Sequence, residues 1–135
     1  MAYEVFSDAW AEQWANEIRT SEAYRQAAAK WEGTVCLEAA DGETTVAAVF
    51  VDLWHGECRA ARAATPDDLE TTDYALRAGL DTWRKVLDGG LEPLLGLMTG
   101  KIKLRRGNIA GLTPYIEASK QMVAAAARVE TIFPG

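Results

Sequence analysis

Apolar residues recur with two different periods along this chain, and the change of period divides it into segments. Near the N-terminus, Trp10, Trp14 and Ile18 recur every four residues behind Ser7, which can cap a helix. This spacing predicts a helix, and a second short helix is expected over 22–30. We interpret the tryptophan stripe as the face that packs on the core rather than as an aromatic binding box.

After Gly33 the period shortens to two and β-branched residues become frequent, which is typical of strands. The strands expected here, with tight turns at 41–43 and 55–57 between them, are 34–40, 44–54 and 58–64. Residues 64–70 are predicted to form a loop with solvated carboxylates. Residues 71–78 are predicted to form a fourth strand, although alanine and aspartate fit strands poorly.

The second half of the chain is predicted to hold three helices. Residues 80–90 carry their apolar side chains on one face. The segment 91–100 has Pro93 in its first turn and is apolar on nearly every side, so it must be buried or line something. A long helix follows residue 108, bent or restarted at Pro114, and its wide apolar face contains alanine, serine and methionine.

Four cations gather in one predicted strand, KIKLRR, although the chain has a formal charge of −6. Alternation along a strand puts the cations on one side and the apolar residues on the other: Lys101, Lys103 and Arg105 against Ile102 and Leu104. Such a row commonly protects a sheet edge from pairing with another chain. A second interpretation is that the row attracts an anionic headgroup or a membrane surface.

Length and charge exclude several classes of protein. A chain of 135 residues is expected to form one domain over 1–135, and a pI near 4.8 argues against a nucleic-acid binder. No apolar run reaches about 18 residues and the N-terminus lacks a signal core, so a soluble, cytoplasmic protein is expected. Cys36 and Cys58 lack zinc spacing and are expected to be buried free thiols. No cofactor or metal is expected.

Catalytic motifs are missing from the sequence, which contains no nucleophile with a base, no phosphate-binding glycine loop and no metal spacing. His55 stands alone at a turn and is expected to be solvated. Asp52 and Asp73 lie in predicted strands, and either would be a base with a raised pKa if it were buried in an apolar pocket. In the competing interpretation, the Asp52 side chain points outward and the Asp73 carboxylate accepts hydrogen bonds from nearby backbone N–H groups. A small isomerase or cyclase therefore remains an alternative.

The order of the segments resembles the sterol carrier protein family, in its type-2 lipid-binding domain. The residues that carry the resemblance are Val51-Asp52 with Gly56, Asp73, Trp83, Gly90 with Pro93, Gly100-Lys101-Ile102-Lys103-Leu104 and Gly107-Asn108. Arg106 and the longer final segment depart from the family pattern. They favour a bacterial-type member that carries a lipid other than a sterol.

The resemblance implies an α+β fold, in which helices cover a mainly antiparallel five-stranded sheet and an apolar cavity lies between sheet and helices. It also implies non-catalytic binding, and transfer, of a lipid or fatty-acyl ligand. Given such a cavity, we expect the row Lys101, Lys103 and Arg105 to attract an anionic headgroup, or transiently a membrane surface, at its mouth. The lining predicted from the apolar segments is Trp83, Leu87, Leu94, Leu97, Met98, Ile102, Leu104, Ile109, Leu112, Ile116 and Met122. The sequence does not determine the oligomeric state, and a homodimer is one of the options. A further alternative for the function is a protein-interaction module without a cavity.

Overall fold

The computed structural model describes residues 1–134, and its main feature is a mixed five-stranded sheet in the order β4-β3-β2-β5-β6. The strands are β2 (Glu32–Asp41), β3 (Thr44–Trp54), β4 (Glu57–Ala63), β5 (Tyr74–Ala78) and β6 (Lys103–Arg106). In this sheet β2 and β5 run parallel and the other neighbouring pairs run antiparallel. The predicted fold class and both predicted hairpins are confirmed.

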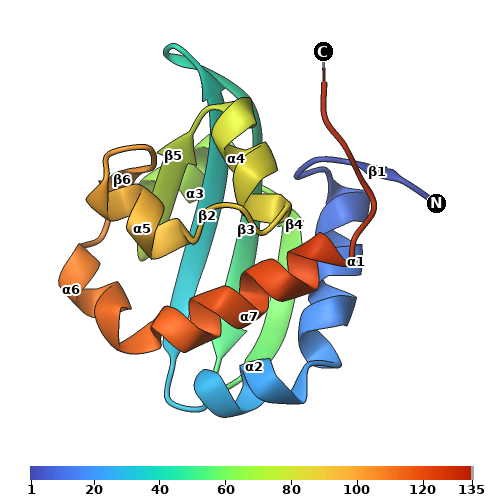
Figure 1. Cartoon of the computed structure of the whole chain (residues 1–135), viewed down its shortest axis with the longest axis vertical. Helices are drawn as coiled ribbons and strands as arrows, with labels where there is room; N and C mark the ends of the chain where they lie inside the picture. The colour runs from blue at the N-terminus through green and yellow to red at the C-terminus, as the bar shows by residue number, and fades with distance from the viewer. Residues whose placement is uncertain (135) are drawn as a thin grey trace.

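One face of the sheet is covered by most of the helices (Figure 1). They are α1 (Asp8–Arg19), α2 (Glu22–Ala27), α4 (Leu80–Leu87), α5 (Pro93–Met98), α6 (Ile109–Leu112), the 3-10 turn η1 (Thr113–Tyr115) and α7 (Ile116–Ala127). The Ser7 side chain accepts the Trp10 N–H at the start of α1, as predicted. The long predicted helix is divided, because Pro114 cannot donate a backbone hydrogen bond and η1 interrupts the helix there.

The opposite face carries the helix α3 (Pro66–Thr71), in the segment that was predicted to be a loop. That prediction was wrong. Thr65 and Asp68 form a capping box and Pro66 occupies the first turn, so the segment carries a strong helix-start signal in a helix too short to show apolar periodicity. Leu69 packs on Cys36 and Ala75 of the sheet, and Asp68 is buried rather than solvated.

The edge strand β4 is protected by α1, which lies along it (Figure 1). The Asp8 carboxylate accepts the Ala63 N–H at 2.8 Å, and the Arg19 side chain donates to the Cys58 carbonyl at 3.1 Å. Near the chain ends, β1 (Tyr3–Glu4) pairs with β7 (Thr131–Ile132), which follows α7. The end of α7 is therefore tied to the start of α1.

The charged strand is shorter than predicted, since β6 begins at Lys103 rather than at Lys101. Ile102 turns inward under α5, and a Cβ at Gly96 would lie 2.7 Å from its Cδ1 atom. Gly96 is therefore the residue that lets α5 approach the strand closely. Gly107, with φ +91°, then turns the chain toward α6. A Cβ at Gly107 would lie 2.9 Å from the Asp73 carbonyl oxygen.

Candidate functional site

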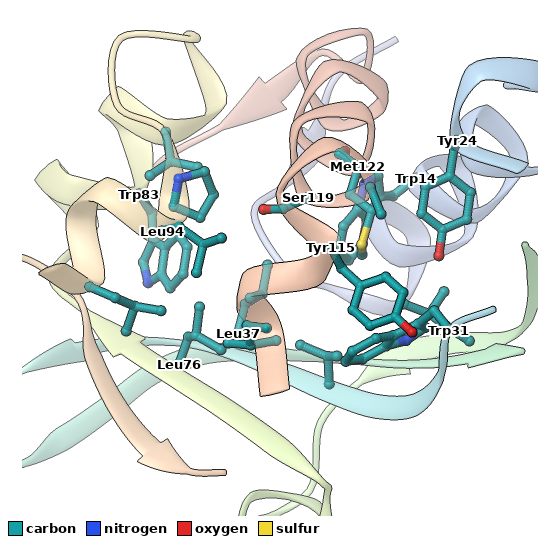
Figure 2. Close-up of a pocket in the computed structure, with 17 residues that line it drawn as sticks. Trp14, Tyr24, Trp31, Leu37, Leu76, Trp83, Leu94, Tyr115, Ser119 and Met122 are labelled. Atoms are coloured by element: carbon teal, nitrogen blue, oxygen red, sulfur yellow. Dashed lines mark hydrogen bonds between the residues drawn. The ribbon is translucent and has the colours of Figure 1, made fainter. Parts of the chain in front are cut away.

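The candidate site is an apolar cavity of about 100 Å³ between the sheet and its covering helices (Figure 2). The sheet contributes Val35, Leu37, Leu53 and Leu76, all on one face of β2, β3 and β5. Trp31, just before β2, and the helices provide the rest: Trp14, Tyr24, Trp83, Val86, Pro93, Leu94, Leu97, Leu112, Tyr115, Ala118, Ser119 and Met122. No lining side chain is charged, so the cavity can accept hydrocarbon but offers no charged partner to a buried ion.

Two of the tryptophans are fixed in place by their indole N–H groups. Trp83 donates to the Glu38 carbonyl at 2.8 Å, and Trp14 donates to the Met122 carbonyl at 3.0 Å. Because these bonds join α4 to β2 and α1 to α7, the large rings act as rigid parts of the wall. Ala118 and Ser119 of α7 are short, so they leave space beside these rings that larger side chains would fill.

Part of the predicted lining lies at the cavity. Trp83, Leu94, Leu97, Leu112 and Met122 line it. Leu87 and Ile102 are buried in the core without lining it, and Leu104 is half-buried against the core. Met98, Ile109 and Ile116 point outward, with exposed fractions of 73%, 40% and 39%. The helix α5 exposes Leu95 and Met98, and η1 at Pro114 divides the predicted long helix, so the expected apolar stripe is not continuous.

Sequence reasoning missed the sheet wall and the N-terminal part of the lining. The signal was present, because Val35 and Leu37 alternate with Cys36 and Glu38 along β2 and therefore share one face. Trp14 was assigned to the core, and it does pack there, but one side of its ring also borders the cavity.

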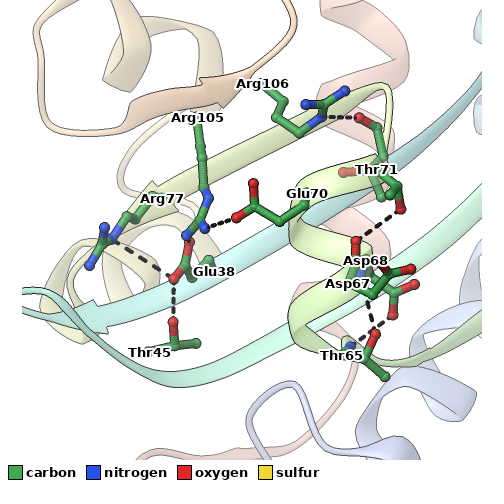
Figure 3. Close-up of polar contacts among 11 residues, drawn as sticks. Glu38, Thr45, Thr65, Asp67, Asp68, Glu70, Thr71, Arg77, Arg105 and Arg106 are labelled. Atoms are coloured by element: carbon green, nitrogen blue, oxygen red, sulfur yellow. Dashed lines mark hydrogen bonds and ion pairs between the residues drawn. The ribbon is translucent and has the colours of Figure 1, made fainter.

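The predicted row of cations is divided between two roles. Lys101 and Lys103 are exposed and form no ion pair within residues 1–134. Arg105 instead points to the far face of the sheet, where it contacts Glu38 at 2.9 Å and also Glu70 (Figure 3). The expected headgroup role of Arg105 is corrected by this placement, because two carboxylates already occupy its guanidinium.

The network around Glu38 is fully buried at its centre, since the Glu38 side chain has 0% exposure. Thr45 donates to it, and Arg77 lies 3.9 Å away (Figure 3). The hydrogen bond to Glu70 and then the contact with Glu38 raise the pKa of Arg105. A buried carboxylate needs such partners to stay ionised.

The two aspartates considered as bases lie away from the cavity. The Asp52 carboxylate pairs with Arg59 at 3.0 Å, and Asp73 accepts the Thr34 N–H at 2.9 Å. Neither lines the cavity, so the geometry gives no support to the isomerase or cyclase alternative. His55 is about half-exposed and contacts Glu32 at 2.6 Å.

The described residues offer few other groups for catalysis, metal binding or membrane insertion. Cys36 and Cys58 are buried and free, as predicted, and burial raises the pKa of the Cys36 thiol to about 11. Residues 1–134 contain no cluster of three metal-ligating side chains. No helix among them has both the length and the hydropathy to cross a bilayer.

Comparison with known proteins identifies the scaffold. The sequence pattern of the family described as the SCP-2 sterol transfer family matches residues 13–117. A crystal structure of sterol carrier protein 2 is 41% identical with a TM-score of 0.82, and the match covers 93% of this chain and 99% of that one. The solution structure of a conserved Thermus thermophilus protein, described as a candidate sterol carrier protein, is 39% identical with a TM-score of 0.85, covering 98% and 94%.

A more distant solved structure shares the fold. It is the sterol carrier protein-2 of Aedes aegypti in complex with the C16 fatty acid palmitate, at 17% identity and a TM-score of 0.52, covering 86% of this chain and 98% of that one. No curated protein sequence matches the chain significantly.

Proposed function

The chain belongs to the SCP-2 sterol transfer family, and on that premise we propose that it is a non-catalytic carrier of a lipid or fatty-acyl chain. The ligand binds in the cavity between the sheet and the helices, and residues 1–135 act as one lipid-binding domain. The observation that carries this proposal is the wholly uncharged lining of the cavity. The Aedes aegypti protein of the same fold is in complex with palmitate, whose C16 hydrocarbon chain is the kind of group that such a lining accepts.

The cavity is small for a whole lipid, so we expect the covering helices to move when a ligand binds. An apolar cavity of about 150 Å³ accommodates a molecule of the size of benzene, so the present 100 Å³ holds only a fragment of an acyl chain. Burying about fourteen methylenes contributes roughly 11 kcal/mol. Ordering the ligand and displacing the helices cost several kcal/mol, which leaves an affinity on the order of micromolar.

A membrane surface is the partner that we assign to the segment 93–116. This segment contains none of the chain's 20 acidic residues, in a protein of net charge −6, and its Lys101 and Lys103 are exposed without an ion pair among residues 1–134. It also carries Leu95, Met98, Ile109 and Ile116, which are 39% to 73% exposed. Exposed apolar side chains in the same segment as Lys101 and Lys103 suit the headgroup region of an anionic bilayer.

The proposed activity requires no reaction and no cofactor. The Asp52–Arg59 ion pair and the Asp73–Thr34 hydrogen bond favour a carrier without catalysis. Two free buried thiols suit a reducing compartment such as the cytoplasm, where we place the protein.

The test is to fill the cavity. Ala118 is buried and lines it, so Ala118→Phe puts a ring into the space that the ligand needs. Ala110, in α6, is exposed, and Ala110→Phe is the matched control. We expect the wild type and Ala110→Phe to take up a fluorescent acyl ester, and Ala118→Phe to bind at least tenfold more weakly. Equal uptake by both variants, or no uptake by the wild type and no lipid extracted from it, would overturn the proposal.

A further inference from the structure

Trp31 differs from the other buried tryptophans in its hydrogen bonding. Trp10 donates its indole N–H to Thr131 at 2.8 Å, and Trp14 and Trp83 donate theirs to backbone carbonyls. The Trp31 Nε1 atom is buried and has no hydrogen-bond partner within residues 1–134. A buried donor without an acceptor is costly, and native proteins seldom contain one without a reason.

The position of Trp31 indicates what is missing. Its ring lines the cavity, is 93% buried and makes an edge contact with Tyr115 at 4.9 Å between centroids (Figure 2). The Tyr115 hydroxyl donates to the Lys30 carbonyl at 3.3 Å, and although its oxygen could also accept, it forms no hydrogen bond with Trp31 Nε1. Thr72 Oγ1, the other buried unpaired polar atom in the described chain, belongs to the short segment after α3 and does not line the cavity.

The charge of the missing acceptor follows from the lining. None of the side chains around the cavity is a cation, so an ionised carboxylate beside Trp31 would be buried without a counter-ion. An ester carbonyl, a ketone or a hydroxyl oxygen accepts the same N–H without that penalty. The opposite end of the cavity, around Trp83 and Leu94, offers no indole N–H, because Trp83 already donates to Glu38.

We propose that Trp31 binds the polar end of the ligand through its indole N–H, and that this end carries an uncharged acceptor oxygen. The hydrocarbon then extends toward Trp83. This inference rests on the proposed lipid-carrier function, and it names the chemical class of the cargo as an ester, ketone or alcohol lipid rather than an ionised fatty acid.

The test compares two ligands and two variants. A fatty acid methyl ester and an alkane with the same number of non-hydrogen atoms compete against a pyrenyl-alkane probe. Trp31→Phe keeps an aromatic ring but removes the donor, so it should weaken the ester about three- to tenfold and leave the alkane within twofold. Trp14→Phe removes an N–H that is already paired with Met122, so it should change both ligands equally.

A direct readout accompanies the competition. The indole N–H resonance that disappears in Trp31→Phe should shift downfield when the wild type binds the ester and not when it binds the alkane. An equal effect of Trp31→Phe on both ligands, or an unmoved resonance, would overturn the role of Trp31 while leaving the carrier function intact. An ionised fatty acid that binds as tightly as the ester and loses as much on Trp31→Phe would overturn the uncharged class. If the wild type binds no ligand of the set, both proposals fail.

Discussion

The two faces of the sheet differ in the kind of side chain that they bury. On the far face, Glu38 is completely buried, and Arg105, Arg77 and Thr45 hold it in a defined geometry (Figure 3). On the near face, uncharged side chains surround a space that they do not fill (Figure 2). The same strand serves both, since Leu37 faces the cavity and Glu38 faces the network.

This difference indicates that one face of the sheet is rigid and the other can adapt to a ligand. Ion pairs and hydrogen bonds have preferred directions, so the far face fixes the positions of β2, β5 and β6 relative to one another. Apolar contacts have no preferred direction, so the near face can rearrange around guests of different shape. A rigid sheet beneath a helical layer that can rearrange suits a protein that carries ligands of different shapes.

The largest expected effect comes from breaking the far-face network. Arg105→Met leaves the Glu38 carboxylate buried with only Thr45 and the more distant Arg77, so we expect a loss of about 3 kcal/mol in the free energy of unfolding. Urea denaturation measures it. Lys103→Met, at an exposed position of the same strand, is the control and should change stability by less than about 0.5 kcal/mol. A loss of vesicle binding by Arg105→Met at unchanged stability would instead restore its membrane role.

A second effect on the far face depends on pH. The hydrogen bond from Arg62 lowers the pKa of Asp68 to about 2, from an ordinary value of 3.8. The carboxylate therefore contributes stability above about pH 4, and this contribution is lost as the pH falls toward 2. We expect it to be about 1 to 2 kcal/mol, given that Arg62 is half-exposed.

The measurement is the pH dependence of unfolding in urea. In Asp68→Asn the part of the acid-induced loss between pH 4 and pH 2 that belongs to this group should disappear. An unchanged slope in that range would show that the Arg62–Asp68 pair contributes nothing.

The exposed residues of the segment 93–116 should show a smaller effect, on membrane binding rather than on folding. Lys101→Gln and Met98→Ser should each weaken binding to phosphatidylglycerol-containing vesicles about fivefold, since each removes one favourable contact with the bilayer. Lys85→Gln in α4 and Val46→Ser in β3 are matched exposed controls outside 93–116. Vesicle flotation measures it, and equal losses in the controls would remove the special role of this segment.

The smallest effect is expected at Asp52. Its ion pair with Arg59 is partly exposed, so Asp52→Asn should cost less than about 1 kcal/mol and leave ligand uptake unchanged. A steroid enone serves as substrate for both proteins. Turnover by the wild type that disappears in Asp52→Asn would revive the isomerase hypothesis.

The sequence predicted the elements better than the site. Periodicity located the strands and most of the helices, because an alternating or four-residue pattern reports which face is buried. It could not separate cavity wall from packed core, since Leu94 and Leu87 are equally apolar and differ only in what lies opposite. The placement of Met98 was wrong for a related reason. In so short a helix nearly every residue is apolar, and the pattern does not mark the exposed side.

The cations illustrate a different limit. Alternation correctly separates Arg105 from Leu104, but it does not reveal that Glu38 and Glu70 lie on that side of the sheet. Glu38 lies more than 60 residues earlier in the chain, and only the pairing order of the strands brings the two together. Long-range ion pairs of this kind depend on topology, which local pattern does not encode.

The uneven attachment of α7 has a kinetic consequence. Its later half is held by the Trp14–Met122 bond, the Arg128–Glu17 pair and the β1–β7 pairing, whereas its start follows the proline-interrupted turn η1. Backbone amides near the start should therefore exchange with deuterated solvent sooner than those of the later half. Exchange of these early amides that is faster than global unfolding would identify this helix end as the part of the covering layer that opens.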